Sequence, residues 1–273
     1  MSEAIFVHEG GTFVPTENAC SPWSPKSLHG GSAAALLAHG IEQAKGDPAL
    51  IPARMTIDLF RAVPRAPLRL HTTPVRTGRR IQALTVSLLA EDTEVARANA
   101  LLLLPTEISI GESASFLRDL PGDPNAIATT SLMPDEARLS TNPGLHTTVQ
   151  ARWVSGHPQG KGGRATAWLH FPLPFIAGQE TTPLMRVAAS SDLGNGIAHI
   201  RMDDGMGFIN TDITLYLHRE PESDWICLDV ASAAEPHGIG LIRGTVYDTA
   251  GPIGSLTEAI LANPRPPGPA QGG

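Results

Sequence analysis

The sequence has little of what several common classes of protein require. Only two of its 273 residues, Cys20 and Cys227, are cysteines, and no C-x-x-C spacing occurs, so neither a zinc site nor a disulfide framework is expected. The formal net charge of −7 provides no broad basic surface for nucleic acid. The most apolar stretches, residues 33–38 and 98–104, are far too short to cross a membrane.

Several sequence motifs are also missing. Residues 1–6 lack the charged and apolar segments of a signal peptide, so we expect a reduced, cytoplasmic protein. Residues 30–34 lack the closing glycine of a G-x-S-x-G nucleophile elbow. Residues 156–163 lack the spacing and the Ser or Thr of a Walker A loop. The ten histidines show no metal-binding spacing, so no metal is expected.

The composition is that of a folded protein with a full core. Apolar residues make up 41% and charged residues 17% of the chain, which argues against disorder over most of it. The length fits two modest domains or one duplicated unit.

The first half predicts one buried helix followed by four strands. Residues 32–45 follow His29-Gly30-Gly31, are small or apolar on all sides as far as Ala38, and stop before Gly46 and Pro48, which is typical of a buried helix. The strands are rich in Val, Ile, Leu and Thr and are separated by turn residues. They are expected at residues 54–63, 68–75, 81–89 and 95–104.

The second half predicts the same arrangement. Thr182 and Pro183 are a good N-cap and first residue for a short helix that reaches about residue 193 and ends at Gly194. Two strands precede this helix and four follow it. They are expected at residues 147–154, 164–171, 208–218, 225–233, 240–247 and 253–261.

The domain boundaries follow from these elements. Residues 1–105 form the first unit, residues 147–262 the second, and residues 106–146 the connection, with a short helix near residues 113–120. The Pro- and Gly-rich tail, residues 263–273, is expected to be disordered.

A constant offset relates the two halves. Leu59 aligns with Leu215, Val86 with Ile242, and Asp92 with Asp248, each at a spacing of 156 residues (215 − 59 = 242 − 86 = 248 − 92). Duplication of this kind produces a pseudo-dimer, and ligand sites tend to lie where the halves meet.

The halves differ where such a site would form. The offset places Asp192 opposite Leu36 and Asn210 opposite Arg54, and a later drift of two places Glu258 opposite Ala100. Gly30 and Gly31 have bulkier residues, Arg186 and Val187, as counterparts. This asymmetry predicts one working site.

Glycines at a helix start expose backbone N–H groups, so Gly30 and Gly31 could hold a thioester carbonyl and its oxyanion, or could merely permit a tight turn. His29, which precedes them, is grouped with them as a substrate-binding residue. Asp192 lies near a helix C-terminus, where the helix dipole and partial burial should raise its pKa and make it a better base. Alternatively it is an exposed C-cap residue.

Asn210 and Glu258 can each be interpreted either as functional residues or as ordinary structural ones. Asn210 could orient a water or the carbonyl, or could be a polar residue at a strand edge. Glu258 needs a partner if its strand is buried, and otherwise is a surface residue. Arg76, Arg79 and Arg80 bracket a hairpin turn and could receive the phosphates of a coenzyme A nucleotide, although a solvated turn is the more common case.

The sequence resembles the TesB-like acyl-CoA thioesterase (thioesterase II) family. The resemblance runs through most of the chain and is clearest at residues 28–31, 54–61, 75–81, 191–196, 210–212 and 218–221. It implies an α+β double hotdog, in which two tandem helix-wrapped antiparallel sheets form one continuous pseudo-dimeric sheet.

The resemblance also implies a mechanism. In this family an Asp, a Thr or Asn, and a Gln hold the attacking water; Asp192 and Asn210 match the first two, and Glu258 stands where Gln is usual. Glu258 could share a proton with Asp192, could be the stronger base, or could leave a protein that binds acyl-CoA without hydrolysing it well.

The implied function is cytoplasmic hydrolysis of acyl-CoA in fatty acid metabolism, with coenzyme A as part of the substrate, no other cofactor, no nucleic acid or membrane partner, and possible homodimers. One alternative is a non-catalytic acyl-CoA or lipid binder. Another is a hotdog enoyl-CoA hydratase or dehydratase, which would use an Asp–His pair; His29 is the only histidine placed near the proposed seam.

Overall fold

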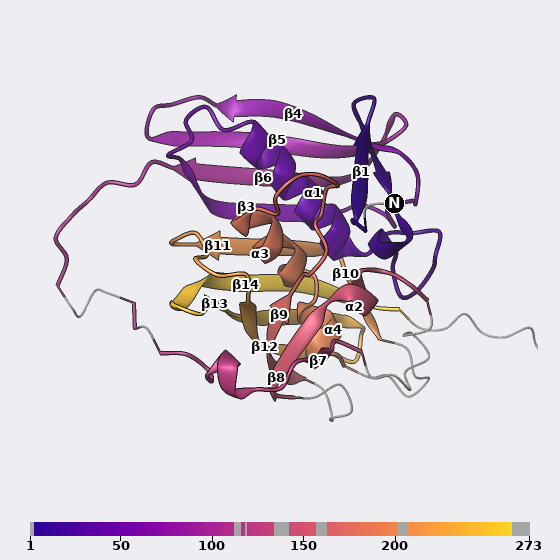
Figure 1. Cartoon of the computed structure of the whole chain (residues 1–273), viewed down its shortest axis with the longest axis vertical. Helices are drawn as coiled ribbons and strands as arrows, with labels where there is room; N and C mark the ends of the chain where they lie inside the picture. The colour runs from indigo at the N-terminus through magenta and orange to yellow at the C-terminus, as the bar shows by residue number, and fades with distance from the viewer. Residues whose placement is uncertain are drawn as a thin grey trace, which may run out of the picture.

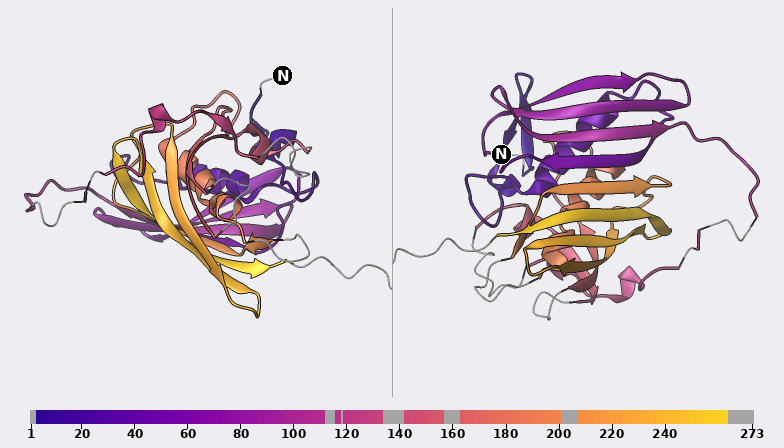
Figure 2. Two further views of the ribbon diagram at one scale, coloured as in Figure 1. Left: turned by 90° about the horizontal axis from the view of Figure 1, so that it is seen from below. Right: turned by 180° about the vertical axis from the view of Figure 1, so that it is seen from behind.

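The computed structural model describes residues 3–111, 116–117, 119–133, 142–156, 163–200 and 207–263. A single sheet of 14 strands forms one side of the molecule, and the helices α1 (Gly30–Gln43) and α3 (Pro183–Ser191) lie together against it (Figure 1). Figure 2 shows the sheet curving around these helices. All the strand pairings are antiparallel in the described part of the chain, apart from an isolated parallel bridge between Phe6 and Ile176.

The N-terminal half contains the expected helix and its four strands. An additional hairpin, which the sequence analysis missed, precedes α1 and extends this edge of the sheet. The strands are β1 (Phe6–Glu9), β2 (Thr12–Pro15), β3 (Ile51–Leu59), β4 (Leu68–Arg76), β5 (Ile81–Ala90) and β6 (Thr93–Leu103).

The C-terminal half repeats this plan around α3. Its strands are β7 (Thr130–Ser131), β8 (Gln150–Ser155), β9 (Arg164–His170), β10 (Phe208–Asn210), β11 (Asp212–Leu217), β12 (Ile226–Ala234), β13 (Ile239–Asp248) and β14 (Gly251–Ala262). The short helices are η1 (Glu17–Ala19), η3 (Pro124–Ala126), α2 (Leu145–Thr148) and α4 (Gly194–Ile197).

The two halves join edge to edge through β3 and β11. In this antiparallel pair Ile57 lies opposite Ile213, and these residues are separated by the repeat offset of 156 (213 − 57). A residue that pairs with its own counterpart lies on a two-fold axis, so the register marks the pseudo-two-fold axis of the duplicated fold. The sequence prediction of one continuous pseudo-dimeric sheet is confirmed.

The central helices are buried because small side chains cover most of their surfaces. Residues 31–41 of α1 are all buried, and α1 packs directly on α3. The helices run antiparallel: the start of α1 meets the end of α3, where Gly31 contacts Asp192, and the end of α1 meets the start of α3, where Glu42 contacts Thr182. Each helix start therefore lies beside the other helix's end.

Several details differ from the sequence prediction. The second helix ends at Ser191, and Gly194 begins the short helix α4 instead of ending the longer one. The strand expected over residues 208–218 is interrupted at Thr211. Of the helix expected near residues 113–120, residues 116, 117, 119 and 120 are not helical and the others lie outside the described residues, as does the tail beyond residue 263.

Candidate active site

The predicted convergence of the first helix start and the second helix end is present in the structure. Asp192 is the C-cap of α3 and is only 8% exposed. Its Oδ2 accepts a hydrogen bond of 2.7 Å from the backbone N–H of Gly31, in the first turn of α1. A carboxylate at a helix N-terminus is stabilised by the unpaired N–H groups there, so this contact fixes Asp192 at the seam between the halves.

His29 makes the second contact to the same carboxylate. It is the N-cap of α1, and its Nδ1 lies 2.7 Å from Asp192 Oδ2. The Gly31 nitrogen is 3.1 Å from the same Nδ1, but this contact and the short carboxylate contact require opposite protonation of Nδ1. Two unprotonated acceptors 2.7 Å apart would repel, so we place the hydrogen on Nδ1, from where it is donated to Asp192.

Asn210 completes the set of hydrogen-bond donors. It ends β10, and its Nδ2 donates to Asp192 Oδ1 at 2.9 Å and to the Asp192 backbone oxygen at 3.1 Å. The Asn210 Oδ1 atom is buried and has no hydrogen-bond partner among the described residues. Asn210 is therefore a partner of Asp192, with one acceptor atom still available.

The two glycines are required by close packing. A Cβ atom on Gly30 would lie 2.3 Å from Asp192 Oδ1, and one on Gly31 would lie 2.7 Å from the backbone oxygen of Ala189 in α3. The prediction that both amides are free to hold an oxyanion needs correction, because Gly31 N–H donates to Asp192. Of the two N–H groups, that of Gly30 alone has no hydrogen-bond partner among the described residues.

The predicted direction of the Asp192 pKa shift is wrong. Burial does raise the pKa of Asp192, but the nearby His29, with hydrogen bonds from His29, Asn210 and Gly31, outweighs burial and lowers the pKa below its ordinary value. The prediction considered burial and the dipole of α3 but none of these partners. Asp192 is therefore ionised over the neutral range.

Glu258 is buried without hydrogen-bond donors among the described residues, and its pKa is shifted in the opposite direction. It projects inward from β14 between the buried residues Leu256 and Ile260, is 0% exposed, and neither carboxyl oxygen has a hydrogen-bond partner in the described part of the chain. Burial, with the charges of Asp192 and Asp212, raises the pKa of Glu258 well above its ordinary value. The alternative of a surface glutamate is excluded.

The pKa values of the two carboxyl groups are therefore shifted in opposite directions. Hydrogen-bond donors lower the pKa of Asp192, whereas burial and the negative charge of Asp192 raise the pKa of Glu258. Glu258 also packs against the short helix that follows Asp192, since a Cβ on Gly194 would lie 2.4 Å from Glu258 Oε1. Titratable pairs whose pKa values are pushed apart are typical of acid–base sites.

The arginine cluster lies elsewhere. Arg76, Arg79 and Arg80 line a shallow hollow at the β4–β5 turn. The neighbouring Gln82 hydrogen-bonds Ala44 and Gly46, at the C-terminal end of α1. Asp192 lies at the other end of this 14-residue helix, about 20 Å away at 1.5 Å per residue. The structure does not bring these arginines to the Asp192 site, and their binding of phosphate stays a prediction.

The other junction, between the end of α1 and the start of α3, does not reproduce the hydrogen-bond donors around Asp192 in the described residues. Glu42 accepts a 2.6 Å hydrogen bond from Thr182 Oγ1, but α3 begins with Pro183, which has no N–H to offer. The residues that correspond to Asn210 and Glu258 are Arg54 and Ala100. Among the described residues, the second junction therefore has no donor set comparable to that around Asp192, as the asymmetry of the sequence predicted.

Sequence reasoning missed one feature of the site. It grouped His29 with the substrate-binding residues and considered an Asp–His pair only for the hydratase alternative, not for hydrolysis. The His29 ring also stacks near that of His146, with centroids 6.3 Å apart. The signal available in the sequence was a histidine immediately before the helix-opening glycines.

The described residues contain no group of His, Cys, Asp and Glu side chains that could hold a metal ion. No helix among them has the length and the continuous apolar surface needed to cross a bilayer.

Similar proteins support the duplicated fold. Structures of proteins that are each 16% identical to this chain superpose on most of it. A hot dog fold protein of unknown function from Alicyclobacillus acidocaldarius has a TM-score of 0.71 and covers 95% of this chain and 96% of its own. A putative thioesterase from Novosphingobium aromaticivorans has a TM-score of 0.64 and covers 97% and 94%, and the acyl-CoA thioesterase II TesB2 from Mycobacterium marinum has 0.62 and covers 89% and 92%.

At this level of identity the structures establish the double hotdog fold. No curated protein sequence matches the chain. Family profiles, however, match both halves: residues 20–103 match the acyl-CoA thioesterase N-terminal domain, and residues 121–261 match the acyl-CoA thioesterase C-terminal domain. The chain therefore belongs to the acyl-CoA thioesterase family.

Proposed function

We propose that this protein hydrolyses acyl-CoA thioesters to a free acid and coenzyme A by activating a water molecule at the Asp192 site. The observation that carries the proposal is the donor-bound carboxylate of Asp192 at the start of α1, with a lowered pKa, together with the buried carboxyl of Glu258, whose pKa is raised. The site has groups for both proton acceptance and hydrogen-bond donation.

Each residue has a role in this reaction. The free Gly30 N–H at the start of α1 polarises the thioester carbonyl and stabilises the oxyanion. The pair formed by Asp192 and His29 removes a proton from water as the water oxygen bonds to the carbonyl carbon. Asn210 orients the water through its unpartnered Oδ1, and neutral Glu258 donates a hydrogen bond as the usual Gln would. Cleavage of the C–S bond releases the thiolate, which takes up the transferred proton.

Release of free thiol is the direct test of this function. The purified protein is supplied with acyl-CoA esters of increasing chain length, and thiol release is followed with a thiol reagent. We expect catalytic turnover for at least part of the series. Binding of acyl-CoA without thiol release at any length would contradict the proposal and support a non-catalytic binder.

The contact between His29 and Asp192 specifically favours a second candidate. Enoyl-CoA hydratases of the hotdog class use an Asp–His pair, and here the two side chains are 2.7 Å apart. The same preparation is therefore supplied with crotonyl-CoA, and loss of the conjugated double bond is measured. Hydration of crotonyl-CoA without thiol release would contradict the hydrolytic function and support the hydratase function.

Glu258 should tolerate replacement by the family's usual glutamine. We expect Glu258→Gln to retain thiol release, because a neutral carboxyl and an amide both combine a donor with an acceptor. The variant should also be more stable than the wild type at pH 8. A carboxyl whose folded pKa is raised binds more protons folded than unfolded, so its destabilising effect grows as pH rises from about 4.3, the ordinary Glu value, through the folded pKa.

Thermal unfolding of both proteins between pH 4 and pH 9 measures this effect. The difference in Tm should be small at pH 4 and should widen in favour of Glu258→Gln as pH rises. Exposed Glu235, at the β12–β13 turn, provides a matched Glu→Gln control that should not alter the profile. Loss of thiol release in Glu258→Gln at a Tm no lower than that of the wild type would instead assign Glu258 the role of base.

A cytoplasmic location, a role in fatty acid metabolism, the absence of a cofactor other than the coenzyme A of the substrate, and pairing into homodimers stay predictions.

A further inference from the structure

We propose that Nε2 of His29 is the atom that takes the proton from the attacking water, and that Asp192 acts as a positioning residue that orients His29. This inference rests on the proposed hydrolytic function and assigns its base. It differs from the sequence-based expectation, in which Asp192 itself took the proton and His29 lay on the substrate side.

The carboxylate of Asp192 has little capacity left for a water molecule. Its Oδ2 already accepts from the Gly31 N–H and from His29 Nδ1, both at 2.7 Å. Its Oδ1 accepts from Asn210 at 2.9 Å and lies so close to Gly30 that no Cβ would fit between them. Donors that hold a carboxylate in its charged form also make it a poorer proton acceptor.

His29 has the opposite arrangement. In the neutral ring, a hydrogen on Nδ1 that is donated to Asp192 leaves the free lone pair on Nε2. No described residue makes a hydrogen bond to Nε2, and the His29 side chain is 11% exposed. A carboxylate that fixes the tautomer and orientation of an imidazole, and stabilises the imidazolium that forms, is the arrangement of a His–Asp dyad.

The position of His29 in the fold also suits this role. As N-cap of α1 it immediately precedes Gly30, whose N–H is the free donor proposed for the oxyanion. The proton acceptor and the oxyanion donor therefore come from adjacent residues on one rigid, buried helix start. The charged and titratable groups in contact with the ring include Asp192 at the end of α3 and His146 of α2.

A proton passes from water to Nε2, the water oxygen bonds to the carbonyl carbon, and the carbonyl oxygen becomes the oxyanion. When the tetrahedral intermediate collapses, the C–S bond breaks, and the thiolate takes the proton back from Nε2. His29 ends neutral, and the products are a carboxylic acid and a thiol.

Two variants of His29 test the proposal. His29→Asn keeps a good N-cap residue with a donor group for Asp192 but has no base, so kcat for thiol release should fall roughly 10²–10⁴-fold at a Tm close to that of the wild type. His29→Ala should be equally slow, and added imidazole should restore part of its rate with saturation. His71→Asn, on the exposed face of β4, is the histidine control and should have wild-type activity and no response to imidazole.

The outcomes separate the two proposals. If the wild type releases thiol and His29→Asn is equally active, the assignment of His29 is wrong and hydrolysis stands. If His29→Asn fails to fold, rescue of His29→Ala by imidazole supports the assignment, and the absence of rescue overturns it. If the wild type releases no thiol, the hydrolytic function fails, and the base assigned to it falls as well.

Discussion

Replacing Asp192 with asparagine is expected to lower the rate of thiol release by about 10²–10⁴-fold while leaving the fold intact. The amide keeps the size of the carboxylate but loses its charge. It also presents an NH₂ group to at least one of the donors that now surround the carboxylate. His29 would then lose the carboxylate that fixes its tautomer. In a His–Asp pair this loss lowers the rate more than the loss of the carboxylate's charge alone.

The measurement is kcat for thiol release with the best acyl-CoA substrate, together with Tm. Asp58→Asn is the matched control, because Asp58 lies at the same seam in β3, opposite Asp212 of β11, but makes no contact with Asp192 in the described structure. An unchanged rate in folded Asp192→Asn, with wild-type behaviour of the control, would remove Asp192 from the mechanism.

The fold was predictable because its patterns are local. The run of small residues around Ala34 has no polar side, which allows only a buried helix, and alternation defined the strands to within a few residues. The constant offset of 156 predicted the duplication, and the pairing of Ile57 with Ile213 in the structure has the same spacing. The β1–β2 hairpin was missed because its strands are four residues long.

The candidate site was predictable in outline. The offset singled out Asp192, Asn210 and Glu258, and the structure brings the first two into direct contact and the third close enough to shift in pKa. The charge state of Asp192 was not predictable, because it depends on donors 2.7–2.9 Å away. Sequence spacing does not fix such distances.

The arginine cluster shows a different limit. A hairpin turn can be located in a sequence, but which end of a buried helix it lies beside depends on the direction of the strands. Here β4 ends and β5 begins beside the C-terminus of α1, at the end opposite Asp192.

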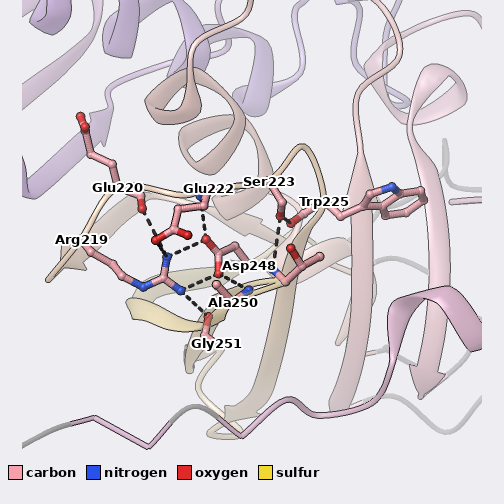
Figure 3. Close-up of polar contacts among 9 residues, drawn as sticks. Arg219, Glu220, Glu222, Ser223, Trp225, Asp248, Ala250 and Gly251 are labelled. Atoms are coloured by element: carbon pink, nitrogen blue, oxygen red, sulfur yellow. Dashed lines mark hydrogen bonds and ion pairs between the residues drawn. The ribbon is translucent and has the colours of Figure 1, made fainter.

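Breaking the ion pair between Arg219 and Asp248 is expected to have the largest effect on stability. Asp248 is 0% exposed and accepts hydrogen bonds from both terminal nitrogens of Arg219 and from the backbone N–H groups of Glu222 and Ala250 (Figure 3). The network ties the turn between β11 and β12 to the turn between β13 and β14. Burial raises the pKa of Asp248, but these four donors outweigh it and lower the pKa below its ordinary value.

Asp248→Asn should therefore lower the free energy of unfolding by about 3–5 kcal/mol, because it leaves the largely buried Arg219 with only the exposed Glu222, 3.6 Å away, as a charge partner. The expected fall in Tm at pH 7 is on the order of 10 °C. A depressed carboxyl pKa stabilises the fold at pH values above the unfolded value, and this contribution is lost as pH falls through the folded pKa. The Tm difference between wild type and variant should accordingly shrink under acid conditions.

The duplication supplies the control for this measurement. Asp92 is the counterpart of Asp248 at the offset of 156 and pairs with Arg69 at 3.0 Å, but its side chain is fully exposed. A solvated pair gains little from its charges, so Asp92→Asn should leave Tm unchanged. Equal shifts of Tm in the two variants would mean that the burial of Asp248 does not determine its contribution to stability. A large shift in Asp248→Asn alone would show that the same position in the repeat became a structural anchor only in the half where it is enclosed.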